Sequence, residues 1–512
     1  MKRLLALLGA LALCLTLSGC WDPDTAPEPE DFWELEEPED AVPEQSVKAT
    51  RFTLPYLNSQ TLDPIACSDG VQQVVGSLLY EGLFTLDERF VPQPALCASF
   101  TRSADGLVYT FTLREDAVFS DGSALTPADV LAAFRRAQVS DRYAARFKDV
   151  VSMRVTRSAF LLTLSRADAA LPALLDIPIV KSGTEKNSVP LGTGPYCLVT
   201  DESGAGLVRN ALWRGSDDAL PERIELAPAK DADTAAYLFS AENAHLLTAD
   251  LLSETAAAAL GGVDITDAPT ATMLFLGCNV RRAPLDDAAL RAAMSAAVDR
   301  EAVVASLLAG HASAAQFPIA PSSPLYPAAL EAPCSNDAYR AALAARGASA
   351  PDAPAEPLEL TLLVNEENPF KTGVADHLAR TLSAENVTVT PVVLPWADYC
   401  SALERGDFDL WLGEVRLTAD WDVSLLIGTG GALNYGGYSS AAADAALAAF
   451  LANEDEASAA ALCELLSAEA PILPLVFKSL SVLTPEGRID GLSPTAAQPL
   501  RGLTEQMLRF GA

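Results

Sequence analysis

The stretch that decides the fold covers residues 107–130 and reads LVYTFTLREDAVFSDGSALTPADV. At its start, strongly apolar side chains alternate with more polar ones, which predicts a β-strand with one buried face. The pair Asp121-Gly122 that follows is a turn signal. Thr126 has the side chain of a helix N-cap and Pro127 suits the first helical position, so a capped helix should come next.

Several segments around this stretch match a known family in their order and spacing. They are Thr61-Leu62-Asp63-Pro64, Leu79-Tyr80-Glu81-Gly82-Leu83, Asp105-Gly106-Leu107, Tyr109-Thr110-Phe111 and Leu191-Gly192-Thr193-Gly194-Pro195-Tyr196. Together they resemble the signature of the family 5 extracytoplasmic solute-binding proteins, which serve peptide, nickel and related ABC importers. The resemblance covers the chain from about Val47 to the C-terminus.

The resemblance implies an α/β fold of the periplasmic-binding-protein type (type II), with two lobes and an extra subdomain in the first lobe. Lobe I is then expected at residues 47–273 and 466–512, with the subdomain at about 68–188. Lobe II is expected at residues 274–465. The two lobes of such a protein close around a cargo.

Periodicity alone gives an architecture for the region after residue 357. Strands are expected at 358–364, 387–394 and 410–413, and helices at 372–384 and 396–405. Alternating strands and helices predict a parallel sheet with right-handed crossovers. The low-complexity segment 341–357, just before this region, is expected to be a loop after a short helix.

Composition excludes some classes of partner. The chain has 512 residues, half of them hydrophobic, and a formal net charge of -33. This balance argues against nucleic acid, because phosphate binding needs clustered Lys and Arg. It also argues against electrostatic docking on anionic lipid. We interpret the acidity mainly as a source of solubility.

The N-terminus predicts export and a lipid anchor. Residues 1–19 have the basic start and short apolar core of a signal peptide, and the core is too short for a comfortable membrane span. Leu17-Ser18-Gly19-Cys20 resembles a bacterial lipobox, which implies cleavage before Cys20 and lipid on its thiol. The alternative is an ordinary signal with a chance cysteine. Residues 20–46 contain many Asp, Glu and Pro and no basic residue, which predicts a disordered tether.

Seven cysteines remain after Cys14 and Cys20 are set aside. They are Cys67, Cys97, Cys197, Cys278, Cys334, Cys400 and Cys463. They form no CxxC pair, which argues against a zinc site. An odd number cannot all pair within one chain, so we expect buried free thiols, with one or two disulfides as the alternative.

No catalytic pattern is present in the sequence. His245, His311 and His377 are scattered, without metal-ligand spacing, and no Gly-x-Ser-x-Gly motif occurs. Asp407 and Asp409 are expected to cap or end a strand rather than to act as acid and base. We therefore expect no enzyme, no cofactor and no metal.

Two arguments nominate ligand-binding residues. Ligands on parallel sheets bind beyond the carboxyl ends of the strands, and this rule points to Asn365, Glu414 and Arg416 without any family knowledge. By the resemblance, Ser68, Asp69 and Gly70 are similar to the first-lobe segment that pairs with cargo backbone. Trp396 matches a second-lobe aromatic that walls the cavity, with a buried core role as the alternative. The Gly/Tyr loop adds Asn434 and Tyr435.

The segment after the third strand departs from the family pattern. In peptide-binding members, an aspartate there accepts the amine of the peptide; a count without gaps places that position at Thr418, and a slip of two residues at Asp420. Glu414-Val415-Arg416-Leu417 stands where an aromatic is expected, which argues against simple peptide binding. The planar guanidinium of Arg416 suits a carboxylate. The alternative is a salt bridge from Arg416 to Glu414 or to another nearby acid.

These observations predict a lipid-anchored extracytoplasmic solute-binding component of an ABC importer. It would capture a small solute such as an oligopeptide between two lobes and deliver it to the permease. Its expected partners are the cargo, the ABC permease and the cell membrane through lipid on Cys20, and we expect a monomer. The alternative is a surface sensor or ligand-binding lipoprotein for a non-peptide solute, without transport.

Overall fold

The structure is a computed structural model, and it describes residues 51–215, 219–253, 261–348 and 357–510. The predicted signal peptide, the predicted tether and the predicted lipidation site Cys20 lie outside the described residues. Within those ranges, no helix combines the length and the apolar character needed to cross a bilayer.

The decisive stretch folds as predicted. Its strand is β5 (Val108–Leu113), in which every second side chain is buried and the others reach solvent to some degree. Its helix is α3 (Pro127–Ala137), which Thr126 caps. The backbone N–H of Thr126 donates to the carboxylate of Asp129 at 3.0 Å, so the acid in the first turn satisfies a backbone group at the start of the helix.

Strand β5 lies in a four-stranded antiparallel sheet of order β4-β5-β7-β6. The other strands are β4 (Cys97–Arg102), β6 (Val150–Val155) and β7 (Ala159–Leu164). Helix α3 packs against β6 and β7, and the ring of Phe160 lies 6.2 Å from that of Phe111 and 5.3 Å from that of Phe134, between centroids. This aromatic core fixes where the chain continues into the 3-10 helix η1 (Ala144–Phe147).

Two of the family-like segments meet at the end of α2 (Gly70–Leu79). The N–H of Gly194 donates to the carbonyl oxygen of Leu79 at 2.9 Å. A Cβ added at Gly192 would lie 2.1 Å from that same oxygen. Since any side chain would collide with backbone, this approach requires glycine. The glycines therefore serve the packing of the fold.

A second four-stranded sheet has the order β1-β10-β9-β8. Its strands are β1 (Thr53–Leu57), β8 (Tyr196–Asp201), β9 (Gly204–Arg209) and β10 (Arg223–Ala229). β1 and β10 are parallel, and the other pairs are antiparallel. Helices α2 and α4 (Ala232–Ser240) pack beside β1. A short hairpin of β2 (Phe84–Leu86) and β3 (Pro92–Pro94) follows α2.

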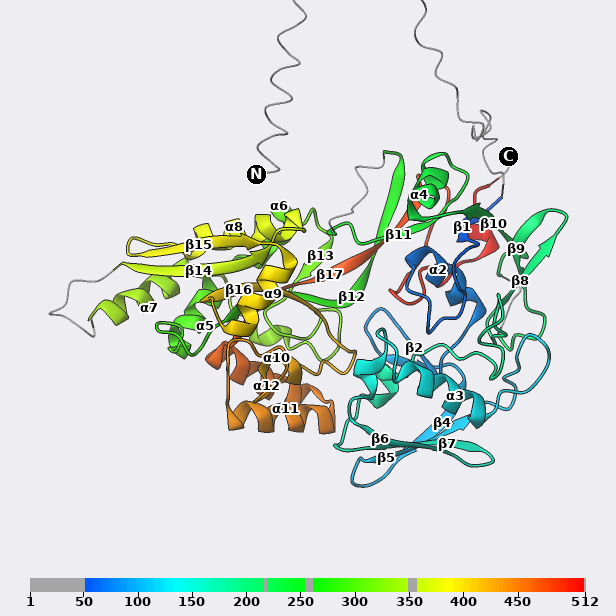
Figure 1. Ribbon diagram of the computed structural model, residues 1–512, viewed down its shortest axis with the longest axis horizontal. Coiled ribbons are helices and arrows are strands. Elements are labelled where there is room, and N and C mark those ends of the chain that lie inside the picture. Colours follow the sequence, from blue (N-terminus) through cyan, green and yellow to red (C-terminus); the bar gives the residue numbers. More distant parts are fainter. Residues whose placement is uncertain (1–50, 216–218, 254–260, 349–356, 511–512) are drawn as a thin grey trace, which may run out of the picture. The chain divides into compact units, whose positions relative to one another are not determined.

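The largest sheet has seven strands, in the order β11-β17-β12-β16-β14-β15 with β13 on β17. They are β11 (Leu247–Ala249), β12 (Val263–Cys278), β13 (Ala312–Ala314), β14 (Leu358–Asn365), β15 (Val387–Leu394), β16 (Leu410–Arg416) and β17 (Ile472–Pro485). β14 is parallel to β15 and β16, which confirms the predicted parallel unit, with crossover helices α8 (Pro369–Leu382) and α9 (Trp396–Arg405). The long strands β12 and β17 run antiparallel side by side (Figure 1).

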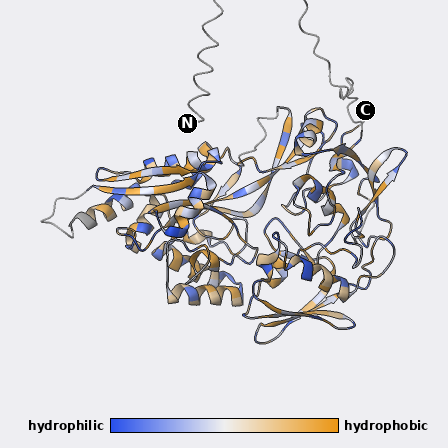
Figure 2. Cartoon of the chain, in the orientation of Figure 1, coloured by the Kyte–Doolittle hydropathy of each residue, from blue (hydrophilic) through white to orange (hydrophobic). Residues whose placement is uncertain are grey.

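The remaining helices are α5 (Ala288–Ala297), α6 (Arg300–Leu307), α7 (Asn336–Ala348), α10 (Ser424–Ile427), α11 (Ala441–Asn453) and α12 (Glu456–Glu469), with short 3-10 turns η2 (Leu171–Leu174), η3 (Ala328–Leu330) and η4 (Glu505–Met507). The loop expected at 341–357 is wrong for residues 341–348, because α7 runs through them. The low complexity of this segment comes largely from alanine, which is the best helix former, so it did not indicate a loop. Residues 349–356 lie outside the described part. The apolar character of the alanine-rich α11 and α12 is visible in Figure 2.

The predicted lobe boundaries stay predictions. The boundary expected after residue 273 falls inside β12, and the one expected after 465 falls inside α12. The seven cysteines beyond Cys20 are free thiols in this structure, and four of them, Cys67, Cys97, Cys278 and Cys463, are buried. The expectation of buried free thiols therefore holds for these four, and it is wrong for Cys334, which is exposed, and for the half-buried Cys197 and Cys400.

We predict that Phe111→Ala lowers the free energy of unfolding by about 3–5 kcal/mol, because the side chain is fully buried and its removal leaves a cavity. Phe100→Ala, on the neighbouring strand, is the matched control; Phe100 is 43% exposed, so the loss should be clearly smaller. Urea denaturation measures both. Equal losses would contradict the assignment of the core face of this sheet.

Candidate ligand-binding cavity

The cavity lies between segments that are far apart in the sequence. It has a volume of about 180 Å³, which suits a small solute or the end of a longer one. One wall comes from α2 and the segment after it, with Gly70, Gln73 and Tyr80. Other walls come from the α3–η1 region, from β16 with Arg416 and from β17 with Leu480.

Three arginines converge on this cavity. Arg142 and Arg146 approach the ring of Tyr143 to 5.2 and 5.1 Å from its centroid, so the ring holds two guanidiniums near one another. Arg146 also forms an ion pair with Asp176 and donates to the carbonyl oxygen of Leu174 at 3.1 Å. These contacts fix Arg146.

Arg416, the last residue of β16, lines the same cavity. Within the described residues, no acid lies within ion-pair distance of its guanidinium. Enclosure in the cavity lowers the pKa of Arg416, and the nearby guanidiniums of Arg142 and Arg146 lower it further, while Asp176 acts in the opposite direction. The charged form of Arg416 therefore has no carboxylate beside it, but the residue is exposed by surface area, so water also stabilises its charge.

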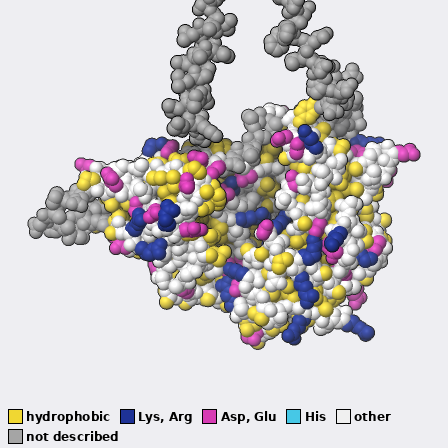
Figure 3. All heavy atoms as spheres, in the orientation of Figure 1, with side chains coloured by type: hydrophobic (Ala, Val, Ile, Leu, Met, Phe, Trp, Pro, Cys, Tyr) yellow, Lys and Arg dark blue, Asp and Glu magenta, His cyan; other side chains and the backbone are white. Residues whose placement is uncertain are grey.

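The acids around the cavity are already engaged. Glu81 lines the cavity, but Arg214 holds both its oxygens at 2.7 and 2.8 Å. Glu414 lies 3.4 Å from Lys371 and 3.5 Å from Lys478. The alternative of a salt bridge between Arg416 and Glu414 is therefore wrong in this structure. Figure 3 shows Lys and Arg side chains beside acidic ones on one face, so the net acidity of the chain does not give a uniformly negative surface.

The predicted first-lobe residues have different places. Gly70 lines the cavity. Asp69 caps α2, accepting from the N–H groups of Val71 at 2.8 Å and Gln72 at 3.1 Å. Ser68 is exposed just before the helix. Because the side chain of Asp69 is occupied by capping, the segment offers the cavity mainly its backbone.

Asn365 lies at the carboxyl end of β14, as expected, and Trp396, which the resemblance nominated, is the first residue of α9. Asn365 ends β14 and donates to Glu367 at 2.8 Å, and Glu367 accepts from the N–H of Trp396 at 2.6 Å. Trp396 is 57% exposed, so the alternative of a buried core tryptophan is wrong. Neither residue belongs to the lining of the cavity above; a role for Trp396 as a cavity wall stays a prediction.

The structure places Glu414 and Arg416 inside β16, because this strand runs three residues further than the expected 410–413. Asp420 is buried and accepts a hydrogen bond from Thr418, and neither lines the cavity.

Asn434 stabilises its own loop through hydrogen bonds with the backbone of Gly428 at 3.0 Å and of Tyr438 at 2.7 and 2.9 Å. Tyr435 packs edge-on against Trp411. Their ligand roles stay predictions.

Sequence reasoning missed Arg142, Tyr143 and Arg146. The signal was present: two arginines four residues apart flank a tyrosine in a chain with only 35 basic residues. The spacing predicts that they share one helical face. It does not predict that Arg416, about 270 residues later, would face them.

Comparison with known proteins identifies the family. The family model described as "Bacterial extracellular solute-binding proteins, family 5 Middle" matches residues 91–432, about two thirds of the chain. The glutathione-binding protein GsiB of Escherichia coli (strain K12) is 29% identical over 286 residues, covering 52% of this chain and 55% of that protein. The match thus spans about half the length of the curated relatives.

Two solved structures illustrate the likeness in fold. HbpA2 from Haemophilus parasuis superposes with a TM-score of 0.71 at 18% identity, covering 90% of this chain and 99% of that one. The oligopeptide-binding protein AppA from Bacillus subtilis, in complex with a nonapeptide, gives 0.58 at 18% identity, with 90% and 99% covered.

The chain therefore belongs to the bacterial extracellular solute-binding proteins of family 5. Its fold is the two-lobed α/β fold of periplasmic binding proteins, which confirms the predicted fold class. Members of this family are binding proteins, in agreement with the expectation of binding rather than catalysis.

Arg416→Gln should stabilise the cargo-free protein slightly, by up to about 0.5 kcal/mol, because it removes one of three mutually repelling cations. The effect is small since the group reaches solvent. Differential scanning fluorimetry compares it with Arg135→Gln, an exposed arginine on α3 that should change nothing. A clear loss of stability in Arg416→Gln would show instead that Arg416 holds a structural ion pair.

Proposed function

We propose that this protein is the extracytoplasmic solute-binding component of an ABC importer and that its cargo is a small solute with a carboxylate or similar anionic group. The observation that carries the proposal is Arg416, which lacks an acidic partner among the described residues and lines the same cavity as Arg142 and Arg146. An anion there would replace repulsion with charge-assisted hydrogen bonds.

The mechanism follows from where the three arginines are attached. Arg142 and Arg146 lie between α3 and β6, and Arg416 lies on β16 of the large sheet. Cargo stabilises a closed state only through contacts that the open state lacks. An anion that bridges guanidiniums from the two segments has such contacts, so it would hold them together.

The nature of the cargo is narrowed by charge and by the relatives. Family members named in the comparisons bind glutathione and an oligopeptide. We propose a short peptide or peptide-like acid for this chain, with its carboxylate at Arg416. The planar guanidinium binds a carboxylate through two parallel hydrogen bonds, which fixes orientation as well as charge.

The other parts of the proposal concern location and partners. We propose that lipid on Cys20 anchors the protein at the outer face of the cell membrane, that residues 20–46 tether it there, and that the closed form docks on the permease as a monomer. The lipobox-like sequence Leu17-Ser18-Gly19-Cys20 and the family membership support this arrangement.

The test begins with a thermal-shift screen of glutathione and of tripeptides, each as the free acid and as the C-terminal amide, because a bound ligand raises stability by mass action. For the best ligand, Arg416→Ala should weaken binding by about 1.5–3 kcal/mol, the scale of hydrogen bonds to charged groups. Isothermal titration calorimetry measures this loss.

Arg135→Ala is the control, since Arg135 is exposed on α3 and does not line the cavity. Its affinity should match that of the unchanged protein. If Arg416→Ala binds as tightly as the control, Arg416 is not part of the binding site. If amides bind as well as acids, the cargo is not recognised by its carboxylate.

A further inference from the structure

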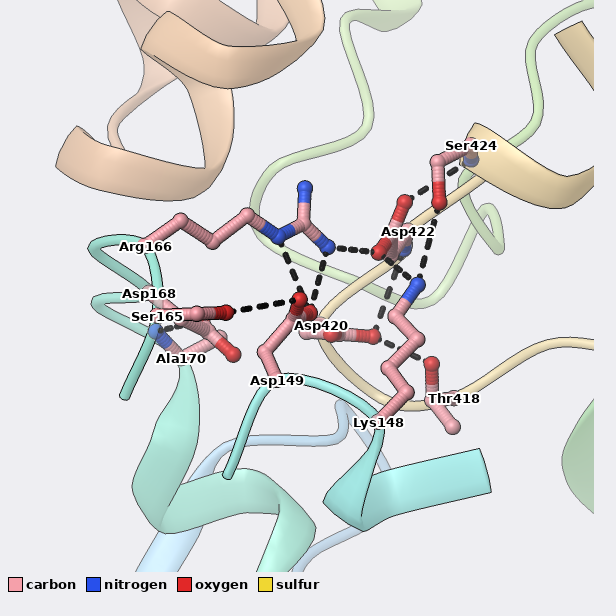
Figure 4. A network of polar contacts seen from close by, with 10 residues as sticks. All are labelled: Lys148, Asp149, Ser165, Arg166, Asp168, Ala170, Thr418, Asp420, Asp422 and Ser424. Atoms are coloured by element: carbon pink, nitrogen blue, oxygen red, sulfur yellow. Dashed lines mark hydrogen bonds and ion pairs between the residues drawn. The ribbon is translucent and has the colours of Figure 1, made fainter. Parts of the chain in front are cut away.

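A second set of charged groups joins the same two parts of the chain, away from the cavity. We call it the junction: residues 148–170 on one side and residues 418–454 on the other. Lys148 and Arg166 both form ion pairs with Asp422, whose side chain is fully buried (Figure 4). Lys148 also donates to the hydroxyl of Ser424 at 3.0 Å.

Other contacts reinforce the junction, two of them from residues outside its defined ranges, Arg102 and Phe90. The N–H of Ala169 donates to the carbonyl oxygen of Leu451 at 2.7 Å. A guanidinium N–H of Arg102, on β4, donates to the carbonyl oxygen of Ala452 at 2.8 Å. The ring of Phe90 meets that of Trp421 edge-on, with centroids 5.0 Å apart. The two sides are therefore held by direct contacts at several separate points.

Among the charged groups that act on one another at the junction, acids outnumber cations. The acids are Asp149, Asp168, Asp420, Asp422 and Glu454, and the cations that face them are Arg102, Lys148 and Arg166. The ion pairs involve only two of the acids: Arg166 pairs with Asp149 and Asp422, and Lys148 pairs with Asp422. Asp168, Asp420 and Glu454 have no ion-pair partner among the described residues.

Burial affects these three acids strongly. It raises the pKa of Asp168, and the charge of Asp420 raises it further. It also raises the pKa of Asp420, which lies beside Asp422. Burial and the charge of Asp420 raise the pKa of Glu454 to about 7. By contrast, burial of Asp422 is outweighed by Lys148 and Arg166, which hold its pKa below the ordinary value.

The backbone at the junction is strained. Phe90, Trp421 and Glu454 have φ angles of +63°, +55° and +50°, in the left-handed region that side-chain-bearing residues rarely adopt. Trp421 lies between Asp420 and Asp422 in the sequence, and the ring of Phe90 packs against it. Strained backbone persists only where surrounding contacts hold it, and it clusters at switch regions. Glu454 adopts this conformation as the C-cap of α11.

We propose that the junction is a proton-dependent latch: the two sides engage while the surplus acids hold protons, and they separate when those protons are lost. The sign follows from the raised pKa values. An acid whose pKa is higher in the engaged state binds a proton on engagement, so engagement is favoured at low pH. As pH rises toward and past about 7, Glu454 and its neighbours ionise and repel one another.

The latch is independent of the cargo proposal, because it requires no ligand in the cavity. It would add pH to the conditions that govern closure: the protein would close more readily in an acidic medium. The test therefore uses the cargo-free protein, and its outcome says nothing about Arg416.

Hydrogen–deuterium exchange with mass spectrometry tests the latch. The peptide that contains the Ala169 amide should lose at least about tenfold in protection between pH 5.5 and pH 8.5, after correction for the intrinsic exchange rate. A peptide covering 272–278 in β12, within the large sheet, is the internal reference and should change by less than about twofold.

Asp168→Asn with Glu454→Gln mimics the protonated state, so its Ala169 peptide should stay protected at high pH. Asp141→Asn with Glu456→Gln removes the same charge from exposed sites and should keep the original pH dependence. Protection that is independent of pH in the unchanged protein would overturn the proposal. A pH dependence that persists in the Asp168/Glu454 variant would also overturn it. If the double variant does not fold, Glu454→Gln alone replaces it and should reduce the pH dependence of protection.

Discussion

The arrangement of the binding cavity depends on like charges held together against their repulsion. Arg142, Arg146 and Arg416 face one space, and Asp176 is engaged by Arg146. Cations in a partly enclosed site repel more strongly than in water, so they stay together only if the fold fixes their backbones. The aromatic core under α3 and the large sheet that contains β16 provide this rigidity.

The short segment after β16 joins the two proposals. Arg416 ends the strand at the cavity, and Asp420 and Asp422 follow within six residues at the junction. On the other side, Lys148 follows Arg146 by two residues, and Arg166 comes after β6 and β7. An anion at one end and protons at the other would therefore act on the same pair of segments. Both additions reduce a local excess of charge, positive in the cavity and negative at the junction.

Much of the fold could be predicted from local patterns, because strand alternation, helix caps and crossovers are encoded by neighbouring residues. The strand at 387–394 and the helix at 396–405 have the predicted ends, and Thr126 caps α3. The site could be predicted only in part. Arg416 was identified by its place at a strand end, but its partners come from a distant segment, which periodicity cannot pair with it. Asp420 was a candidate to accept the amine of a peptide. Its burial and its neighbouring acids depend on tertiary structure, so the sequence did not predict them.

The most direct test of the central claim is a crystal structure of the protein with its tightest acidic ligand from the screen. The account predicts a carboxylate or equivalent anion within hydrogen-bond distance of the Arg416 guanidinium, with Arg142 or Arg146 on its other side. A ligand seated elsewhere, for example against Trp396 and Asn365 with Arg416 left in solvent, would contradict it.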